Sequence, residues 1–236
     1  MRLRNNLLSL VVGALALVGL GGQAQGLGIP VTLASLVVPG ATLTSEDGKF
    51  TFSNFDAAIA PGGGLNPDLN LYFVRALAPG DSAAPGAGFR LTGPMMVADG
   101  NSGFLQLQYT VSGNNGIRIT DAHLWFNGSF NQGAGAPAGL GVGVNEDLFG
   151  GTLPLGVSLS VSKSSGGFDK PLDGTVFAPQ NTFNVLKDVV LNSYSGGGTA
   201  HISAVDQTFT IPEPGTLLLG SFGLLGLATL GRKRVR

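Results

Sequence analysis

The sequence contains no cysteine among its 236 residues. The chain therefore forms no disulfide, offers no thiolate ligand to zinc and has no cysteine nucleophile. Charged residues are also scarce, at 11% of the chain. With neither disulfides nor many ion pairs available, a fold of this chain depends on the packing of apolar side chains, assisted at most by bound ions.

Histidine is nearly absent as well, since His123 and His201 are the only two. Two isolated histidines without cysteine do not form a zinc pattern. The segment Gly100 to Phe104 begins like the Gly-x-Ser-x-Gly turn of hydrolases but lacks its last glycine. We therefore expect no catalytic residues, no metal centre and no cofactor, and a protein that is not an enzyme. A secreted hydrolase remains a weaker alternative, which a deep cleft holding Glu146 and His123 would support.

Positive charge is concentrated at the two ends of the chain. Six of the 13 basic residues lie in the terminal segments, whereas 13 of the 14 acidic residues lie between them. The middle of the chain therefore carries seven basic and 13 acidic residues, a net charge of -6. A mildly acidic middle argues against nucleic acid as a partner.

The first 24 residues have the three parts of a secretory signal peptide. Arg2 and Arg4 form a positive start, the stretch from Leu7 to Leu20 is apolar, and Gly22-Gln23-Ala24 is a small-x-small cleavage site. We predict cleavage after Ala24 and export of the remainder. The alternative is an uncleaved membrane anchor.

Residues 211–236 form a second terminal segment with a different order of parts. Pro212-Glu213-Pro214 precedes an uncharged run from Thr216 to Leu230, and basic residues follow at Arg232, Lys233, Arg234 and Arg236. The apolar run is at the short limit for a transmembrane helix. The basic residues are expected to stop transfer and remain in the cytoplasm, which places the main domain on the periplasmic side of the inner membrane.

These three parts, in this order at the end of the chain, closely resemble the PEP-CTERM sorting signal of Gram-negative, biofilm-forming bacteria. The resemblance implies that exosortase, a membrane transpeptidase-like enzyme, is a partner and cuts at or near Pro212-Glu213-Pro214. It also implies a final location at the cell surface or in the extracellular matrix. An ordinary C-terminal membrane anchor is the alternative.

Between the two terminal segments, residues 25–210 show the alternation of apolar and polar residues that is typical of β-strands. Glycine-rich and asparagine-rich turns separate the strands, and no long amphipathic helix is present. We predict one exported domain, an all-β antiparallel two-sheet sandwich of about nine or ten strands, flanked by an N-terminal signal helix and a C-terminal transmembrane helix. The expected strands are residues 49–55, 70–77, 103–113, 116–126, 156–164, 181–191 and 200–211.

The segment Val111 to Ile119 looks like a hairpin, because Asn115-Gly116 suits a turn with positive φ between two strands. Further along, Trp125 alternates with Leu124 and Phe126 and shares its face with His123. An outward tryptophan beside polar groups is able to stack on a sugar ring, so Trp125 and His123 are a candidate carbohydrate-binding site. The alternative for a single tryptophan is a core or sheet-edge position.

Acidic and amide residues cluster at 66–70, 145–147 and 169–173, in segments expected to be loops. Oxygen ligands of this kind are able to hold calcium, which is the only cofactor that the sequence suggests. None of the three matches a complete calcium loop, and solvated turns capped by Asx side chains are the preferred interpretation.

The sequence thus predicts an exported, membrane-anchored protein that exosortase processes. We expect it to serve as a structural or adhesive component of the cell envelope or of an extracellular exopolysaccharide matrix, as in a biofilm. A carbohydrate-binding module that associates with exopolysaccharide is the alternative.

Overall fold

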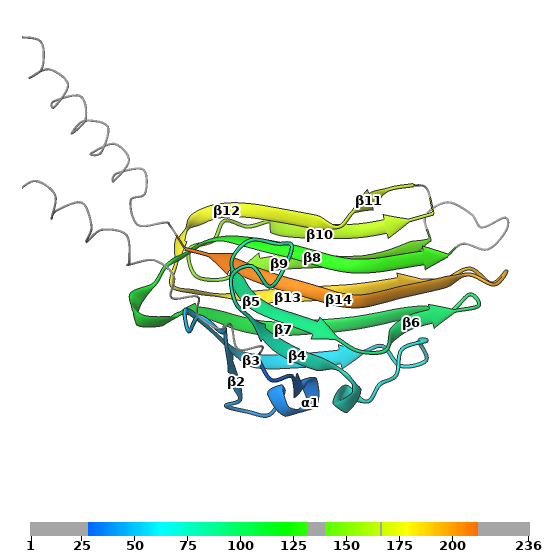
Figure 1. Cartoon of the computed structure of the whole chain (residues 1–236), viewed down its shortest axis with the longest axis horizontal. Helices are drawn as coiled ribbons and strands as arrows, with labels where there is room; N and C mark the ends of the chain where they lie inside the picture. The colour runs from blue at the N-terminus through cyan, green and yellow to red at the C-terminus, as the bar shows by residue number, and fades with distance from the viewer. Residues whose placement is uncertain (1–27, 132–139, 166, 212–236) are drawn as a thin grey trace, which may run out of the picture.

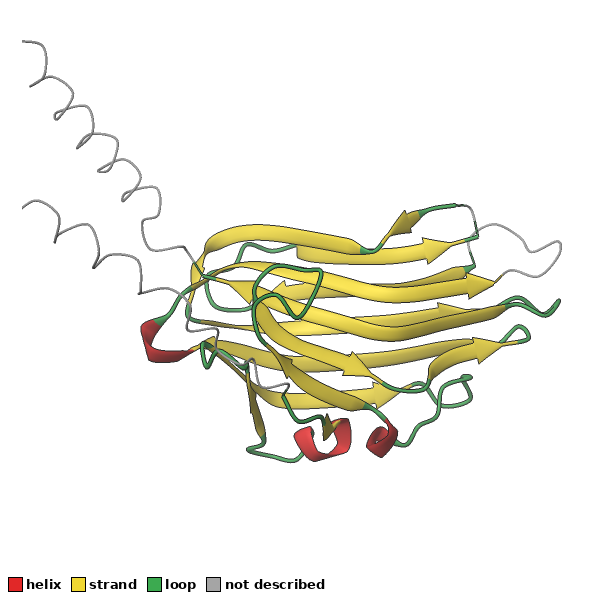
Figure 2. Cartoon of the chain, in the orientation of Figure 1, coloured by secondary structure: helices red, strands yellow, loops and turns green. Residues whose placement is uncertain are grey.

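The computed structural model describes residues 28–131, 140–165 and 167–211, which form two antiparallel β-sheets packed face to face (Figure 1). Strands account for nearly all regular structure in these residues, and the helices are three short turns (Figure 2). They are α1 (Leu33–Leu36), η1 (Leu69–Leu71) and η2 (Asn114–Gly116). The predicted all-β antiparallel two-sheet sandwich is confirmed. The predicted signal helix and transmembrane helix lie outside the described residues.

The first sheet, sheet A, has the strand order β1-β4-β5-β14-β8-β12, with β6 also paired to β14. Its central strand β14 is bonded to β5 on one side and to β8 on the other. The bounds are β1 (Val31–Thr32), β4 (Phe73–Leu77), β5 (Ala87–Thr92), β6 (Met95–Ala98), β8 (Ile119–Asn131), β12 (Leu172–Gln180) and β14 (Thr199–Thr210).

The second sheet, sheet B, has the strand order β11-β10-β9-β13-β7-β3-β2. Its bounds are β2 (Thr42–Thr44), β3 (Phe50–Ile59), β7 (Ser102–Gly113), β9 (Gly141–Phe149), β10 (Val157–Ser164), β11 (Asp169–Lys170) and β13 (Thr182–Asn192). The described residues thus contain 14 strands, more than the nine or ten expected. Four of the additional strands have two to four residues, too few for alternation to be visible in the sequence.

The predicted hairpin at residues 111–119 is wrong, because β7 belongs to sheet B and β8 to sheet A. The turn itself has the expected backbone, with φ of 53° at Asn115 and 76° at Gly116. However, Asn114 donates its backbone N–H to the carbonyl of Lys49 and its side-chain amide to that of Gly48. These bonds fix the turn to the β2–β3 turn of sheet B, and the chain then crosses to the other sheet.

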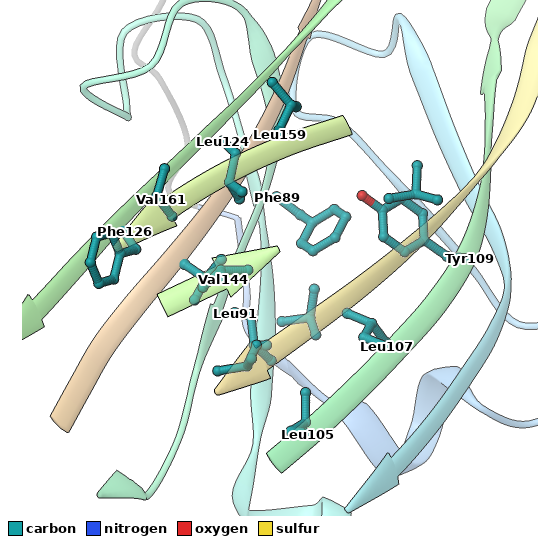
Figure 3. Packing of buried hydrophobic residues seen from close by; sticks show 14 of the residues in the cluster. Phe89, Leu91, Leu105, Leu107, Tyr109, Leu124, Phe126, Val144, Leu159 and Val161 are labelled. Carbon is teal, nitrogen blue, oxygen red and sulfur yellow. The ribbon is translucent and has the colours of Figure 1, made fainter. Parts of the chain in front are cut away.

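The crossover allows the apolar faces of β7 and β8 to pack toward one another instead of lying side by side. Leu105, Leu107 and Tyr109 point into the core from β7, and Leu124 and Phe126 point into it from β8 (Figure 3). Aromatic rings concentrate around Phe89, which lies 5.1 Å from Phe52 and 5.1 Å from Tyr109 between ring centroids, in edge-on geometry. Such edge-on pairs are a favoured aromatic arrangement and help to fix how the sheets meet.

Candidate functional site

Three polar and aromatic side chains lie in one row across the outer face of sheet A. Asp206 of β14 is paired in register with Arg90 of β5 on one side and with Trp125 of β8 on the other. Arg90 donates through Nε and Nη2 to the two carboxylate oxygens of Asp206, at 2.6 and 2.7 Å. Its guanidinium carbon lies 5.9 Å from the centre of the Trp125 ring. The row is therefore a bidentate ion pair joined to a cation–π contact.

The β4–β5 loop, residues 78–86, lies against β5 and β14 on this face (Figure 1). Arg90 also donates to the carbonyl of Asp81, and the hydroxyl of Thr208 donates to the carbonyl of Pro85. Asp206 and Thr208 are fully buried as a result, although both lie on an outer face of the sandwich. The hydrogen bonds to Asp206 raise the pKa of Arg90, against the opposing effect of its partial burial. Arg90 therefore stays charged beside the tryptophan.

Trp125 and His123, the predicted carbohydrate-binding pair, both point outward from β8 and are half-buried. Leu124 and Phe126 take the inward positions, as the alternation predicts. Next to them, the edge strand β12 pairs Leu172 with Trp125 and Gly174 with His123. We call Arg90, Trp125, His123, Leu172 and Gly174 the Trp125 strip.

The Trp125 strip is shallow on its β12 side. A Cβ atom at Gly174 would lie 2.4 Å from Nδ1 of His123, so the β12 backbone runs close beside the imidazole. Leu172 is 42% exposed and Val176, two residues beyond Gly174, is 80% exposed. The strip therefore offers one aromatic ring, partly covered by Arg90, an imidazole and an exposed apolar border.

A second polar group lies at the end of sheet A where β14 finishes. Asp121 accepts the backbone N–H of Thr210 at 2.8 Å and also its hydroxyl, and Nε2 of His123 lies 3.5 Å from the same carboxylate. Partial burial tends to raise the pKa of Asp121, but the hydrogen bonds from His123 and Thr210 outweigh it and hold the pKa below its usual value. Asp121 thus stays ionised and holds the last residue of β14 in place.

Glu146 and His123 do not come together, so the cleft that would have supported a hydrolase does not form from them. Glu146 points into the space between the sheets and is 1% exposed, whereas His123 lies on the outer face of sheet A. His201 is on β14, opposite Met96 and Ser129.

Residues 145–147 are not a loop, which corrects the expectation from the acidic cluster. They lie in the middle of β9, and Glu146 pairs directly across with Lys187 of β13. Lys187 donates to Glu146 and, at 2.8 Å, to the side-chain oxygen of Gln207 on β14. The ion pair thus sits in the core and bridges both sheets. The alternation in the sequence carries a signal for this ion pair, because each strand has a charged residue at an inward position. Glu146 follows the inward residues Val142 and Val144, and Lys187 lies between Val185 and Val189.

The other two acidic clusters form local bonds. Asn66 and Asp68 accept the backbone N–H groups of Asp68 and Asn70, which is the Asx capping that was preferred for this segment. Residues 169–173 are not a loop either, because all but Pro171 lie on β11 or at the start of β12. Asp169 and Asp173 pair with Lys163 and Lys170. In the described ranges, no three acidic or histidine side chains converge as a metal site would require.

The sorting residues Pro212, Glu213 and Pro214 and the basic residues Arg232, Lys233, Arg234 and Arg236 lie outside the described residues. So do the predicted signal peptide, residues 1–24, and the apolar run of residues 216–230. Within the part of the chain that the structure describes, no helix is long and apolar enough to span a bilayer.

Comparison with known proteins finds a specific match to a family model and remote similarity to solved structures. No curated protein matches the sequence. A solved structure of TmCBM61 in complex with β-1,4-galactotriose shares 12% identity over 67% of this chain and 90% of its own, with a TM-score of 0.32. A carbohydrate-binding module of the β-sandwich superfamily shares 12% identity over 65% of this chain and 56% of its own, with a TM-score of 0.23.

At these scores neither structure indicates what the present chain binds. The specific match is to a family model and covers the end of the chain. Residues 210–234 match the model of the PEP-CTERM protein-sorting motif, and the chain therefore carries this motif from the final residue of β14, the last strand of the described residues.

Proposed function

We propose that the protein is an exported, non-enzymatic β-sandwich that its C-terminal tail holds in the inner membrane, with the sandwich on the periplasmic side. Exosortase then cuts at or near Pro212-Glu213-Pro214, and the domain serves as a structural or adhesive component of the envelope or of the extracellular polysaccharide matrix. The observation that carries the proposal is the PEP-CTERM motif at residues 210–234, joined to a sandwich of 14 described strands.

The outer face of sheet B supports a role among hydroxyl-rich polymers. Outward side chains of neighbouring strands bond to one another across this face: Gln106 to Asp188, Thr110 to Asn184 and Ser160 to Asn145, at 2.8 to 3.0 Å. Such a surface of amides, hydroxyls and carboxylates offers both donors and acceptors to a polysaccharide. It lies on β7, β13, β9 and β10, which are contiguous in sheet B.

The experiment changes the two functional parts of the tail separately in the native host. Glu213→Ala removes the charge of the sorting motif and leaves the apolar run intact, so we expect uncleaved protein in the inner membrane. Neutral residues at Arg232, Lys233, Arg234 and Arg236 remove the positive charges that stop transfer, so we expect part of the protein to pass through the membrane or insert poorly. Normal processing of Glu213→Ala, with the wild type unaffected by loss of exosortase, would contradict the proposal.

Carbohydrate binding at the Trp125 strip is the second candidate function. A tryptophan on an outer strand, beside the imidazole of His123 and the guanidinium of Arg90, combines a stacking surface with hydrogen-bond donors. The ion pair with Asp206 holds the guanidinium of Arg90 in place, which reduces the entropy lost on binding.

A matched pair of variants tests this second function. In affinity electrophoresis through gels that contain the host exopolysaccharide, Trp125→Ala is expected to lose most of the retardation that the wild type shows. Phe168→Ala removes another exposed aromatic side chain, 58% exposed on the β10–β11 connection, and is expected to leave retardation unchanged. Equal retardation of both variants and the wild type would exclude the Trp125 strip as the binding site.

A further inference from the structure

The last strand of the sandwich ends where the sorting motif begins. β14 is bonded on both sides up to its final residues, with Phe209 paired to Ala87 of β5 and to Ala122 of β8. Asp121 then holds Thr210 through its backbone N–H and its hydroxyl. The motif match starts at the same residue, 210. The folded domain therefore reaches the sorting motif without a flexible linker.

The sequence leaves little distance between this point and the apolar run. Four residues, 212–215, separate Ile211 from Thr216. Fully extended, the five residue steps from Ile211 to Thr216 span at most about 18 Å. The headgroup layer on one side of a bilayer takes up roughly 5–8 Å of that distance. When the run is inserted, Ile211 is therefore held within roughly 10–13 Å of the headgroup surface.

Other segments at this end extend beyond Thr210 toward the same side. Thr210 pairs with Asp121 of β8, and Gln180 of β12 pairs with Ile119, two residues further toward the end. The β9–β10 loop, residues 150–156, is fixed at that level because Thr152 donates its backbone N–H to Gln180 at 3.0 Å. This loop lies at the end of the sandwich from which the chain leaves β14 (Figure 1).

The chemistry of these projecting segments suits a lipid interface. The β9–β10 loop contains no charged residue, and Leu155 within it is fully exposed, at 102% of its reference area. Arg118, next to Ile119, is exposed and makes no ion pair within the described residues. An exposed apolar side chain and an exposed cation at the same end of the sandwich match the acyl boundary and the phosphates of a bilayer surface.

We propose that, in the uncleaved protein, the sandwich stands end-on on the membrane with Leu155 of the β9–β10 loop in the headgroup layer and Arg118 against lipid phosphates. This inference rests on the membrane anchoring in the proposed function and adds a lipid surface as the partner of this end of the domain. The long faces of the sandwich, including the Trp125 strip, then point sideways and stay accessible.

The absence of cysteine makes a clean test possible. Leu155→Cys and Phe168→Cys each provide a single labelling site, at the proposed membrane end and at the opposite end of the sandwich. The full chain from a host without exosortase is labelled with a polarity-sensitive dye. It is then placed in vesicles of phosphatidylcholine and phosphatidylglycerol that contain a nitroxide near the headgroup.

We expect the label at position 155 to be quenched at least threefold more strongly than the label at 168. A 12-residue Gly/Ser insertion after Ile211, about 20 Å in average span, should bring the two values together while the protein still floats with the vesicles. Equal quenching in protein that floats with the vesicles overturns the end-on arrangement alone. Failure to float overturns the anchoring, and with it this inference.

Discussion

At the scale of single residues, Lys187 and Glu146 form an ion pair in which both side chains are fully buried. Burial raises the pKa of Glu146 and lowers that of Lys187, while their mutual attraction opposes both changes. Gln207 extends the pair to the opposite sheet. Because removing two charges from water is costly, such a pair fixes the register of strands more than it stabilises the fold.

Removing one partner should therefore be far more harmful than removing both. Lys187→Met and Glu146→Leu each leave one buried charge unpaired, and each is expected to lower the free energy of unfolding by about 3–5 kcal/mol. The double variant should lose much less free energy of unfolding than the two single variants together. Its loss is expected to be about 1–3 kcal/mol, because the side-chain oxygen of Gln207 is then left without its partner Lys187. Urea unfolding of all four proteins measures the coupling energy.

The exposed pair of Lys163 and Asp169, 3.2 Å apart, serves as the matched control. Its side chains are 41% and 50% exposed, so its coupling energy should not exceed about 1 kcal/mol. If the two buried substitutions proved additive, the charges of Lys187 and Glu146 would not interact in the folded protein and the buried ion pair would be ruled out.

At the scale of elements, the end of β14 depends on the ionised carboxylate of Asp121. Its pKa is lower in the folded chain than the ordinary value of 3.8, so the stabilisation is complete above that value and is lost as the pH falls through the folded pKa. The wild type should therefore lose stability between pH 7 and pH 3. The Asp121→Asn variant should be less stable than the wild type at pH 7, and its stability should fall less than that of the wild type between pH 7 and pH 3.

Urea midpoints at the two pH values measure this difference, with Asp99→Asn in the β6–β7 turn as the control for removal of an exposed carboxylate. Asp99→Asn should follow the wild type at both pH values. An acid loss in Asp121→Asn as large as that of the wild type would show that the carboxylate does not hold Thr210.

The strands that could be predicted from the sequence are those in which apolar and polar residues alternate over a long stretch. All seven predicted runs contain a strand of the structure, although residues 70–77 begin with the short helix η1 before β4. Alternation identifies the inward face of a strand but not its neighbours in the sheet. The turn at Asn115-Gly116 shows this limit, since its backbone suits a hairpin while the bonds from Asn114 to Gly48 and Lys49 direct the chain to the other sheet.

The candidate site could be predicted only in part for the same reason. The outward positions of His123 and Trp125 follow from alternation within β8. Arg90 and Asp206 come from β5 and β14, and only the pairing of three strands brings them beside Trp125. Cross-strand register arises from long-range pairing, so no local pattern reveals this row. The expectation of a loop at residues 145–147 fails for the same reason, because Lys187, the buried partner of Glu146, is on β13.

At the scale of the whole molecule, a sandwich without disulfides is joined to a short sorting tail. The sandwich is closed by apolar side chains from both sheets and carries polar outer faces. The central strand β14 ends at Thr210, where the match to the sorting motif begins, so the folded domain and the sorting motif share this residue. The central claim is that the C-terminal tail is a sorting signal that exosortase removes after export.

The intact mass of the protein, isolated from envelope and medium fractions of the native host, tests that claim most directly. With active exosortase, the account predicts a mature chain that begins after Ala24 and lacks the residues that follow the Pro212-Glu213-Pro214 motif. Without exosortase, the same measurement should find the tail still attached in the membrane fraction. A chain that keeps Arg232 to Arg236 in the presence of active exosortase would contradict the account and leave the tail as an ordinary membrane anchor.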